Sequence, residues 1–307
     1  MTASLFDAHA HVIGDDWDAY PPASKNAGAP PPARTEYTVT VDSLIAMMDA
    51  HDVTAACLVQ RGRLYGFDNS YIIDSAHEHP GRLYPVVILD PQDPATPDRY
   101  RDMVRHDHVR GFRMQGERPW LLDPAWLCSD RALQVWRTCA ELGTPMTIGL
   151  FMKQLPYTLP LIAIIARRFP DLPILLDHGG MPYGMSQYEV RLAKEAGEDV
   201  VLPTAPHFGI DRTIAIFEDV PNVHFKITEI NMERLLSANV RPAHIVRRLV
   251  DGFGPDRVMW GSDVGQSTLW NYTEKTAMAR SAADFLTPDE TRGFLHDNAA
   301  RVYSVTG

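Results

Sequence analysis

Two histidines spaced two residues apart, His9 and His11, stand near the start of the chain in the apolar run Phe6-Asp-Ala-His-Ala-His-Val12. The run predicts a strand, and on a strand residues i and i+2 point to the same side. Neutral imidazole is the commonest protein ligand for transition metals, so two converging imidazoles can hold one cation. A surface pair on an edge strand explains the same residues, and only further ligand-type residues can decide between the two interpretations.

Two such residues end later apolar runs. His178 follows Pro173-Ile-Leu-Leu-Asp and precedes two glycines, and Asp263 follows Val258-Met-Trp-Gly-Ser. Taken singly, His178 can cap a turn and Asp263 can cap a helix. Together with His9 and His11 they offer three nitrogens and one carboxylate, which suit Zn²⁺ or a similar divalent ion with a position left for water. Asp177, next to His178, is expected on the opposite face as a structural residue.

The elements that must position these residues alternate along the whole chain. Eight short apolar runs predict strands over Leu5–Val12, Ala55–Gln60, Leu83–Leu89, Val109–Met114, Pro145–Leu150, Ile174–His178, Val223–Thr228 and Val258–Gly261. Amphipathic stretches predict helices over Val41–His51, Asn69–Glu78, Pro97–Arg105, Asp130–Leu142, Tyr157–Arg168, Ile210–Phe217, Ala243–Phe253 and Pro288–Arg301, the last with Thr287 as its N-cap.

Repeated strand–helix units imply a parallel sheet covered by helices, and eight of them in about 250–300 residues are typical of a (β/α)8 TIM barrel. We expect one barrel domain over residues 1–307. A doubly wound sheet is the alternative, but Ile13-Gly-Asp-Asp16 after the first strand lacks a glycine-rich phosphate loop. In a barrel the carboxyl ends of the strands share one pocket, so His9, His11, His178 and Asp263 are expected to meet there.

Long loops are expected after strands 1 and 6, over residues 14–40 and 179–209. The first is rich in proline and cannot form a regular element. Because it starts directly beside the histidine pair, we interpret it as a lid or pocket wall rather than a linker.

Composition restricts the partners and the compartment. The formal net charge of -10 argues against nucleic acid and anionic membranes. The three cysteines have no CxxC spacing, which favours a reducing compartment. Residues 1–6 lack the pattern of a secretory signal, and no apolar run reaches the roughly 20 residues that span a bilayer. We therefore expect a cytoplasmic protein with a small-molecule substrate.

At these residues the chain resembles the amidohydrolase superfamily, in the amidohydrolase-related branch of (β/α)8 hydrolases and decarboxylases. Besides the histidine pair, the resemblance rests on Val109-Arg-Gly-Phe-Arg113, His178-Gly-Gly180, Asn222-Val-His-Phe-Lys226, Gly261-Ser-Asp263 and Asp297-Asn-Ala-Ala-Arg301. It implies His9, His11, His178 and Asp263 as ligands of one divalent metal, Zn in the first place, or of none, as in some lactonases of the branch. It also implies that a homodimer is common.

The branch divides into two reaction classes. Lactonases, such as 2-pyrone-4,6-dicarboxylate hydrolase and fuconolactonase-type enzymes, share the Arg-Gly-Phe-Arg strand and the Asp-His-Gly strand end. Decarboxylases, such as aminocarboxymuconate semialdehyde decarboxylase, usually add a catalytic histidine at a strand end where this chain has Thr228 and Glu229. Strand five ends Ile148-Gly-Leu-Phe151, without the lysine or glutamate that bridges two metals in the superfamily. The resemblance therefore favours a hydrolase with at most one metal.

The chemistry of such a site follows from charge. Asp263 is the expected general base, because a carboxylate beside a bound water can take its proton as the water attacks a carbonyl. A metal would lower the pKa of that water toward about 7 and polarise the carbonyl. Without a metal, His9, His11 and His178 would donate hydrogen bonds to the developing oxyanion.

Arginines at strand ends are candidates for binding an anionic substrate. Arg113 ends the fourth strand, and Arg61 and Arg63 follow the second. A guanidinium matches a carboxylate with two parallel hydrogen bonds. Salt bridges to surface carboxylates are the alternative, chiefly for Arg61 and Arg63.

Aromatic and basic residues near strand ends complete the candidate pocket. Tyr65, Phe151 and Tyr183 could enclose a flat ring, although such residues are as often barrel core. His207 lies in the second long loop, within reach of the mouth. Lys226 is expected to face the barrel interior, where it needs Asp263 or Glu229 as a partner or faces the substrate.

Three functions are therefore open. The first is a hydrolase that opens a lactone or related ester of a small carboxylated, aromatic-derived molecule. The second is a metal-dependent, non-oxidative decarboxylase of a related acid. The third is a catalytically inactive barrel that binds a ligand, which leaves four ligand-type residues unexplained.

Overall fold

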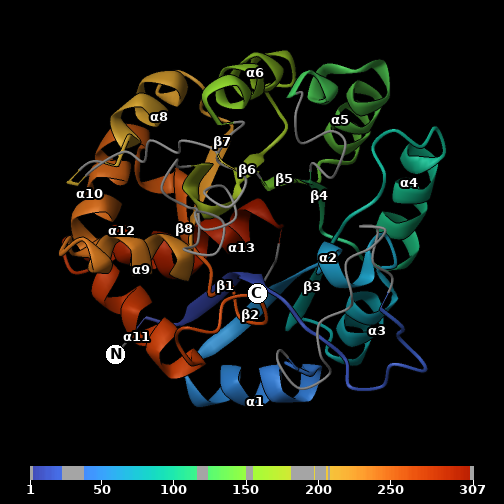
Figure 1. The fold of residues 1–307 in the computed structure, drawn as a ribbon, viewed down its shortest axis with the longest axis horizontal. Helices are drawn as coiled ribbons and strands as arrows, with labels where there is room; N and C mark the ends of the chain where they lie inside the picture. The colour runs from blue at the N-terminus through green and yellow to red at the C-terminus, as the bar shows by residue number, and fades with distance from the viewer. Residues whose placement is uncertain are drawn as a thin grey trace.

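The computed structural model describes residues 3–22, 38–115, 124–149, 155–180 and 208–304, with residues 197, 205 and 206. Eight parallel strands pair in chain order, each with the next. They are β1 (Leu5–Ala10), β2 (Val53–Val59), β3 (Leu83–Val87), β4 (Gly111–Gln115), β5 (Met146–Gly149), β6 (Ile174–Leu176), β7 (Val223–Ile227) and β8 (Val258–Trp260). All eight predicted strands are confirmed, and the architecture is the expected (β/α)8 barrel (Figure 1).

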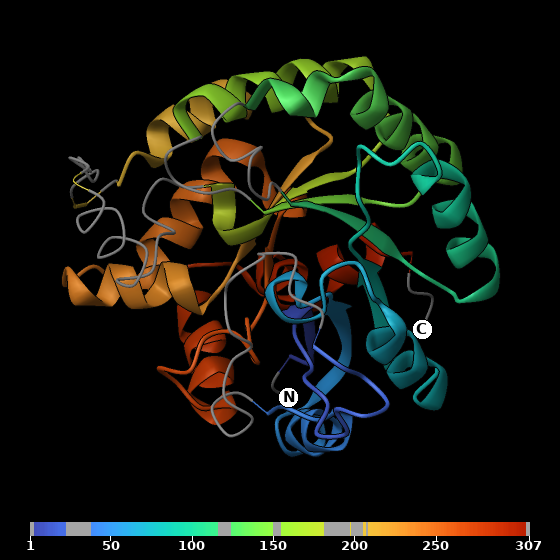
Figure 2. The same ribbon diagram turned by 45° about the vertical axis from the view of Figure 1, so that its right-hand side comes forward.

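Helices surround the strands on the outside (Figures 1 and 2). They are α1 (Val41–Ala50), α2 (Gly62–Tyr65), α3 (Ser70–Glu78), α4 (Thr96–His106), α5 (Asp130–Leu142), α6 (Leu155–Arg168), α8 (Ile210–Phe217), α9 (Glu229–Ser237), α10 (Pro242–Phe253), α11 (Tyr272–Ala282), α12 (Pro288–Arg292) and α13 (Asn298–Val302). Thr287 caps α12 as predicted, accepting from the backbone N–H of Glu290. The sequence interpretation missed the short helix α2 and the longer helices α9 and α11.

The chain segment that continues β8 meets β1, and this contact brings the two ends of the sheet together. The backbone N–H of Asp263 donates to the carbonyl of His9 at 2.7 Å, and that of His11 donates to Val264 at 2.9 Å. The candidate residues from the first and last strands are therefore joined through main-chain hydrogen bonds. The side chains of His9, His11 and Asp263 are therefore close enough to contact one another.

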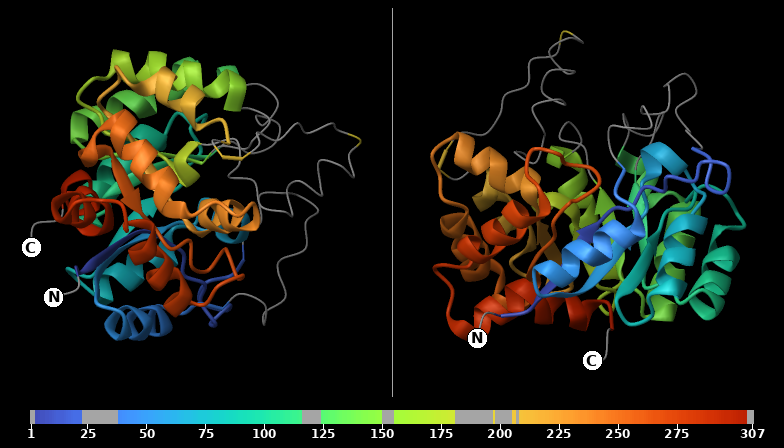
Figure 3. Two further views of the ribbon diagram at one scale, coloured as in Figure 1. Left: turned by 90° about the vertical axis from the view of Figure 1, so that its left-hand side faces the viewer. Right: turned by 90° about the horizontal axis from the view of Figure 1, so that it is seen from below.

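The lower part of the barrel is filled by apolar side chains and closed by the last helix. Val302 and Tyr303 of the C-terminal segment pack with Phe6, Ala8 and Cys57 from β1 and β2. The start of β1 and helix α13 lie at the same end of the molecule (Figure 3). In (β/α)8 barrels the ligand site lies at the carboxyl ends of the strands, opposite this packed end.

Within the described residues, no helix is both long and apolar enough to cross a membrane.

Candidate active site

The two histidines of the first strand and Asp263 form a buried group at the carboxyl end of the barrel. The Nε2 atoms of His9 and His11 lie 3.5 Å and 3.3 Å from Oδ1 of Asp263. One ligand atom from each residue lies within 4.8 Å of the other two, and all three residues are buried. The pairing of β1 with β2 is irregular between Asp7 and Ala10. Such irregularities re-aim side chains next to functional sites.

The first two imidazoles each present Nε2 to this group because their other nitrogen faces an acceptor. Nδ1 of His11 is 2.6 Å from the carbonyl oxygen of Val59, which can only accept, so Nδ1 carries the proton. Nδ1 of His9 faces Oδ1 of Asp177 at 3.2 Å, and a carboxylate likewise favours a proton there. In both rings Nε2 is left as a lone pair directed at Asp263.

Burial keeps these imidazoles neutral. It lowers the pKa of His9 to about 4, against the opposing effect of Asp177. Burial, with Arg61 and Arg113 nearby, also holds the pKa of His11 well below its usual value. A metal ligand must be neutral imidazole, so both rings are in the form that binds a cation.

His178 lies beside the group. It follows β6, and its ring centroid is 5.4 Å from that of His9. Burial lowers the pKa of His178 to about 4, although Asp263 opposes this. Its Nδ1 contacts Thr228 Oγ1 at 2.7 Å. His178 does not belong to the compact group of His9, His11 and Asp263, and its role as a fourth ligand stays a prediction.

The donor set fits a divalent cation. Nε2 of His9, Nε2 of His11 and both carboxylate oxygens of Asp263 are buried and have no hydrogen-bond partner among the described residues. Imidazole lone pairs that face a carboxylate with no proton between them repel it, and a bound cation removes this repulsion. Bonds of 2.0–2.1 Å around tetrahedral zinc separate the ligand atoms by about 3.3–3.4 Å. The observed 3.3 and 3.5 Å agree with that spacing.

Asp177 points into the barrel, so the expectation that it lies on the opposite face is wrong, whereas its structural role stays a prediction. Its Oδ2 accepts from Nε of Arg113 at 2.8 Å, and its Oδ1 faces His9 and, at 3.3 Å, Nζ of Lys226. The β6 strand ends at Leu176, and His178 has a left-handed backbone with φ 52°. The strand alternation used for the prediction therefore stops before Asp177. Burial raises the pKa of Asp177, but Lys226, His9 and Arg113 outweigh it and hold that pKa well below its usual range.

Lys226 is buried as predicted, but its partner is Asp177 rather than Asp263 or Glu229. Its Nζ also lies 3.5 Å from Thr147 Oγ1 and 5.5 Å from the centroid of the Tyr303 ring. These contacts place the ammonium below the histidines, on the packed side of the barrel. Glu229 instead pairs with Lys275. Lys226 thus balances Asp177, and its predicted contact with substrate has no support in these contacts.

The three candidate arginines have different surroundings. Arg113 is buried, and only its Nε is used by Asp177. A Cβ on Gly149 would lie 3.2 Å from Nη2 of Arg113, so this glycine leaves room for the guanidinium. Arg61 precedes α2, and its Nη1 donates to the side chain of Gln266. Arg63 is exposed on α2, and no hydrogen bond or ion pair with another described residue links it to the histidines.

The predicted aromatic wall is only partly described. Tyr65 is buried, and its hydroxyl accepts from the backbone N–H of Gly14 at 2.9 Å. It packs with Ile13 and Leu64 and so holds the segment after β1, and its predicted pocket role stays a prediction. Phe151, Tyr183 and His207 lie outside the described residues, as does the larger part of both predicted long loops.

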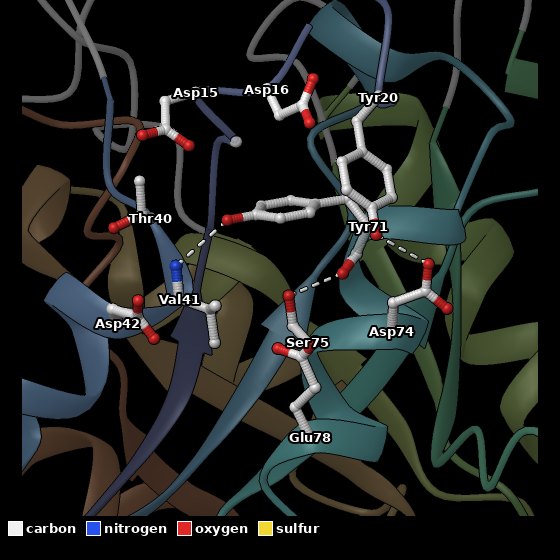
Figure 4. Close-up of a pocket in the computed structure, with 11 residues that line it drawn as sticks. Asp15, Asp16, Tyr20, Thr40, Val41, Asp42, Tyr71, Asp74, Ser75 and Glu78 are labelled. Carbon is white, nitrogen blue, oxygen red and sulfur yellow. Dashed lines mark hydrogen bonds between the residues drawn. The ribbon is translucent and has the colours of Figure 1, made fainter. Parts of the chain in front are cut away.

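A separate pocket of about 210 Å³ lies beside the segment after β1, between the start of α1 and α3 (Figure 4). Tyr20 and Tyr71 cross it: the hydroxyl of Tyr20 donates to Asp74, and the hydroxyl of Tyr71 accepts from the backbone N–H of Val41 at the start of α1. Its carboxylates are Asp15, Asp16, Asp42, Asp74 and Glu78. So many negative charges repel an anion, and this pocket is not where an anionic substrate binds.

Gly261 has no side chain, and the space that a Cβ would fill at this position is occupied by His9. A Cβ at residue 261 would lie 2.6 Å from Cβ of His9 and 2.9 Å from its backbone nitrogen. We expect Gly261→Ala to displace His9, lower zinc affinity and reduce turnover by about 10²-fold, the effect of a misplacement of about 1 Å. Zinc titration and kcat/KM measure this. Gly293→Ala, where the nearest contact is an ordinary 3.4 Å, is the control, and equal behaviour of the two variants would contradict the expectation.

Comparison with known proteins identifies the family. The sequence profile of the amidohydrolase family matches residues 6–305. The chain belongs to the amidohydrolase family. An L-fucono-1,5-lactonase from Burkholderia ambifaria is 26% identical over 244 residues, which cover 78% of this chain and 76% of the lactonase.

Solved structures share the fold at lower identity. A probable 2-pyrone-4,6-dicarboxylic acid hydrolase from Acinetobacter baumannii, with citric acid bound, has a TM-score of 0.71 at 16% identity and covers 98% of this chain and 99% of its own. A zinc-bound amidohydrolase from Burkholderia multivorans has a TM-score of 0.65 at 22% identity, and the match covers 99% of this chain and 100% of that structure. A manganese-bound 5-carboxyvanillate decarboxylase from Novosphingobium aromaticivorans has a TM-score of 0.65 at 17% identity, and the match covers 98% of this chain and 96% of that structure. Relatives of both reaction classes, two of them with metals, thus share this barrel.

Proposed function

We propose that this chain is a hydrolase that opens a lactone or related ester of a small carboxylated substrate, with Asp263 as the general base. The observation that carries the proposal is the buried group of acceptors, in which His9, His11 and Asp263 face one another and no described residue places a donor between them. The similarity to a lactonase and to a pyrone dicarboxylic acid hydrolase supports a cyclic ester as the substrate class.

His9, His11 and Asp263 would hold a divalent ion, zinc by the donor set, with His178 as the fourth ligand. Such an ion, when bound, lowers the pKa of a water and polarises a carbonyl oxygen. Asp263 carries the proton chemistry. Its carboxylate has a second oxygen without a hydrogen bond among the described residues, and this oxygen can accept the proton of the attacking water. Asp263 then returns the proton to the leaving oxygen of the ring.

Positive side chains beside the group fit a carboxylated substrate. Arg61 and Arg113 both lie close enough to depress the pKa of His11. Of the Arg113 nitrogens only Nε donates to Asp177, and the Nη atoms have no hydrogen bond within the described part of the chain. Such a guanidinium at the carboxyl ends of the strands can bind a carboxylate. An aromatic-derived substrate rests on the named relatives and on the predicted aromatic wall.

The decarboxylase alternative draws support from the manganese-bound relative. Against it, the end of β7 supplies Thr228, whose hydroxyl contacts His178, in place of the extra histidine expected of decarboxylases.

A panel of carboxylated lactones, their methyl esters and aromatic acids, assayed with zinc- and manganese-loaded protein, separates the functions. We expect ring opening of a carboxylated lactone without release of carbon dioxide, with a lower kcat/KM for its methyl ester. Release of carbon dioxide from an acid would establish the decarboxylase instead. A panel left wholly unconverted by metal-loaded protein would favour the inactive barrel.

A further inference from the structure

The ring of His178 is held from the end of β7 rather than from its own strand. Its Nδ1 is 2.7 Å from Oγ1 of Thr228, and its backbone carbonyl accepts from Nδ2 of Asn231 at 2.9 Å. Thr228 and Asn231 are fully buried. The two residues therefore contact the same histidine, one at its ring and the other at its main chain.

Backbone groups fix the orientation of the Asn231 amide. Its Oδ1 accepts from the backbone N–H of Thr228 at 3.0 Å, and its Nδ2 donates to the carbonyl of His178. A backbone N–H can only donate and a carbonyl can only accept, so exchanging the amide oxygen and nitrogen would lose both hydrogen bonds. Oδ1 therefore faces Thr228.

This orientation gives the Thr228 hydroxyl an acceptor. Oγ1 of Thr228 lies 3.4 Å from Oδ1 of Asn231, which can take the hydroxyl proton. With its proton directed at Asn231, Oγ1 offers a lone pair to the ring, and the short contact with His178 is then a hydrogen bond donated by Nδ1.

We propose that Thr228 and Asn231 are positioning residues that hold His178 in the tautomer protonated at Nδ1, which leaves Nε2 as a lone pair for the site. The role of that lone pair as a metal ligand rests on the proposed function, whereas the tautomer itself does not. All three imidazoles then have the same polarity, each with Nδ1 facing an acceptor: the carbonyl of Val59, the carboxylate of Asp177 and the hydroxyl of Thr228.

The backbone conformation of His178 explains why the residue needs this support. His178 has a left-handed conformation, with φ 52° and ψ 36°, and stands directly outside β6. Sheet hydrogen bonds do not hold it, and a histidine in this conformation needs support from its surroundings. Asn231 and Thr228 supply that support from a neighbouring strand end, so that one pair sets both the place of the residue and the orientation of its ring.

The tautomer can be measured in the metal-free protein without any substrate. Long-range ¹H–¹⁵N correlation spectra of protein labelled at its 12 histidines report which ring nitrogen carries the proton. The His178 signals are assigned by their loss in His178→Gln. We expect Nδ1 protonated and Nε2 unprotonated in the wild type. A proton on Nε2 of His178 would overturn the proposal.

Variants test whether Thr228 sets this state. In Thr228→Val we expect Nδ1 to lose its proton preference and the zinc affinity, measured by competition with a chelator, to fall about 10–100-fold, the usual effect of removing a residue that orients a metal ligand. Thr228→Ser keeps the hydroxyl and should retain both the tautomer and the affinity. Thr213→Val is the matched control, because Thr213 is buried on α8 and its hydroxyl has no partner among the described residues.

Wild-type tautomer and affinity in Thr228→Val would also overturn the proposal. Should that variant fail to fold, the wild-type spectrum and Thr228→Ser still decide. A failure of lactone hydrolysis would leave the spectra and zinc affinities unchanged, so the two proposals fail separately.

Discussion

Replacing Asp263 by asparagine is expected to lower kcat by about 10²–10⁴-fold, the usual contribution of a general base, while the protein stays folded. The substitution keeps the shape of the side chain, and the backbone hydrogen bond from residue 263 to His9 does not involve the carboxylate. Steady-state kinetics on the proposed ring-opening reaction, with thermal unfolding alongside, measures this effect.

Asp74→Asn provides the control for that experiment. Asp74 is an exposed carboxylate of the separate acidic pocket, bound by the hydroxyl of Tyr20. Its replacement should leave kcat unchanged. Wild-type turnover by Asp263→Asn, or an equal loss in Asp74→Asn, would remove Asp263 as the base.

Replacing Asp177 by asparagine is expected to lower the free energy of unfolding by about 3–5 kcal/mol, because removing one partner of a buried ion pair leaves the others uncompensated. Lys226 and Arg113 both depend on this carboxylate, and the side chains of Lys226 and Asp177 are completely buried. Denaturant unfolding at neutral pH gives the difference in the free energy of unfolding, provided that wild type and variant show the same dependence of that free energy on denaturant concentration.

A double-mutant cycle with Lys226→Met shows whether the loss comes from unpaired charge. Lys226→Met alone should cost less, since Asp177 keeps Arg113. The double variant should recover part of the stability lost in Asp177→Asn, because methionine removes the unpaired ammonium at a similar volume. An Asp177→Asn variant as stable as wild type, or losses that simply add, would contradict the network.

The fold and the meeting of the first and last strands could be predicted because both follow from repetition. Eight apolar runs of strand length, separated by amphipathic stretches, leave few architectures open. Once the barrel was inferred, the positions of His9, His11 and Asp263 at strand ends placed them in one pocket. The structure brings these three together and sets His178 beside them.

Asp177 could not be placed correctly because its prediction used the alternation of a regular strand. That rule holds only while the backbone is extended, and β6 ends one residue before Asp177. The left-handed backbone at His178 was not evident from residue types, although the following Gly179-Gly180 marks a break in regular structure. The misassignment of the Lys226 partner follows from the same error.

Helices α9 and α11 were missed for a different reason. No element was predicted over either range: α9 begins directly after the end of β7, and α11 follows the longer segment after β8. The sequence does carry their start signals: Thr228 and Asn231 form a capping pair, and Asn271 and Glu274 form another. Tyr65 shows a further limit, because an aromatic residue near a strand end serves packing and ligand binding equally well by sequence.

We propose that His9, His11 and Asp263 converge on one cation at the mouth of the barrel. Anomalous diffraction from crystals of the zinc-loaded protein tests it most directly. We predict one zinc peak at about 2.0–2.2 Å from Nε2 of each histidine and from a carboxylate oxygen of Asp263. Loaded crystals with no peak there, or with zinc bound only elsewhere, would contradict it.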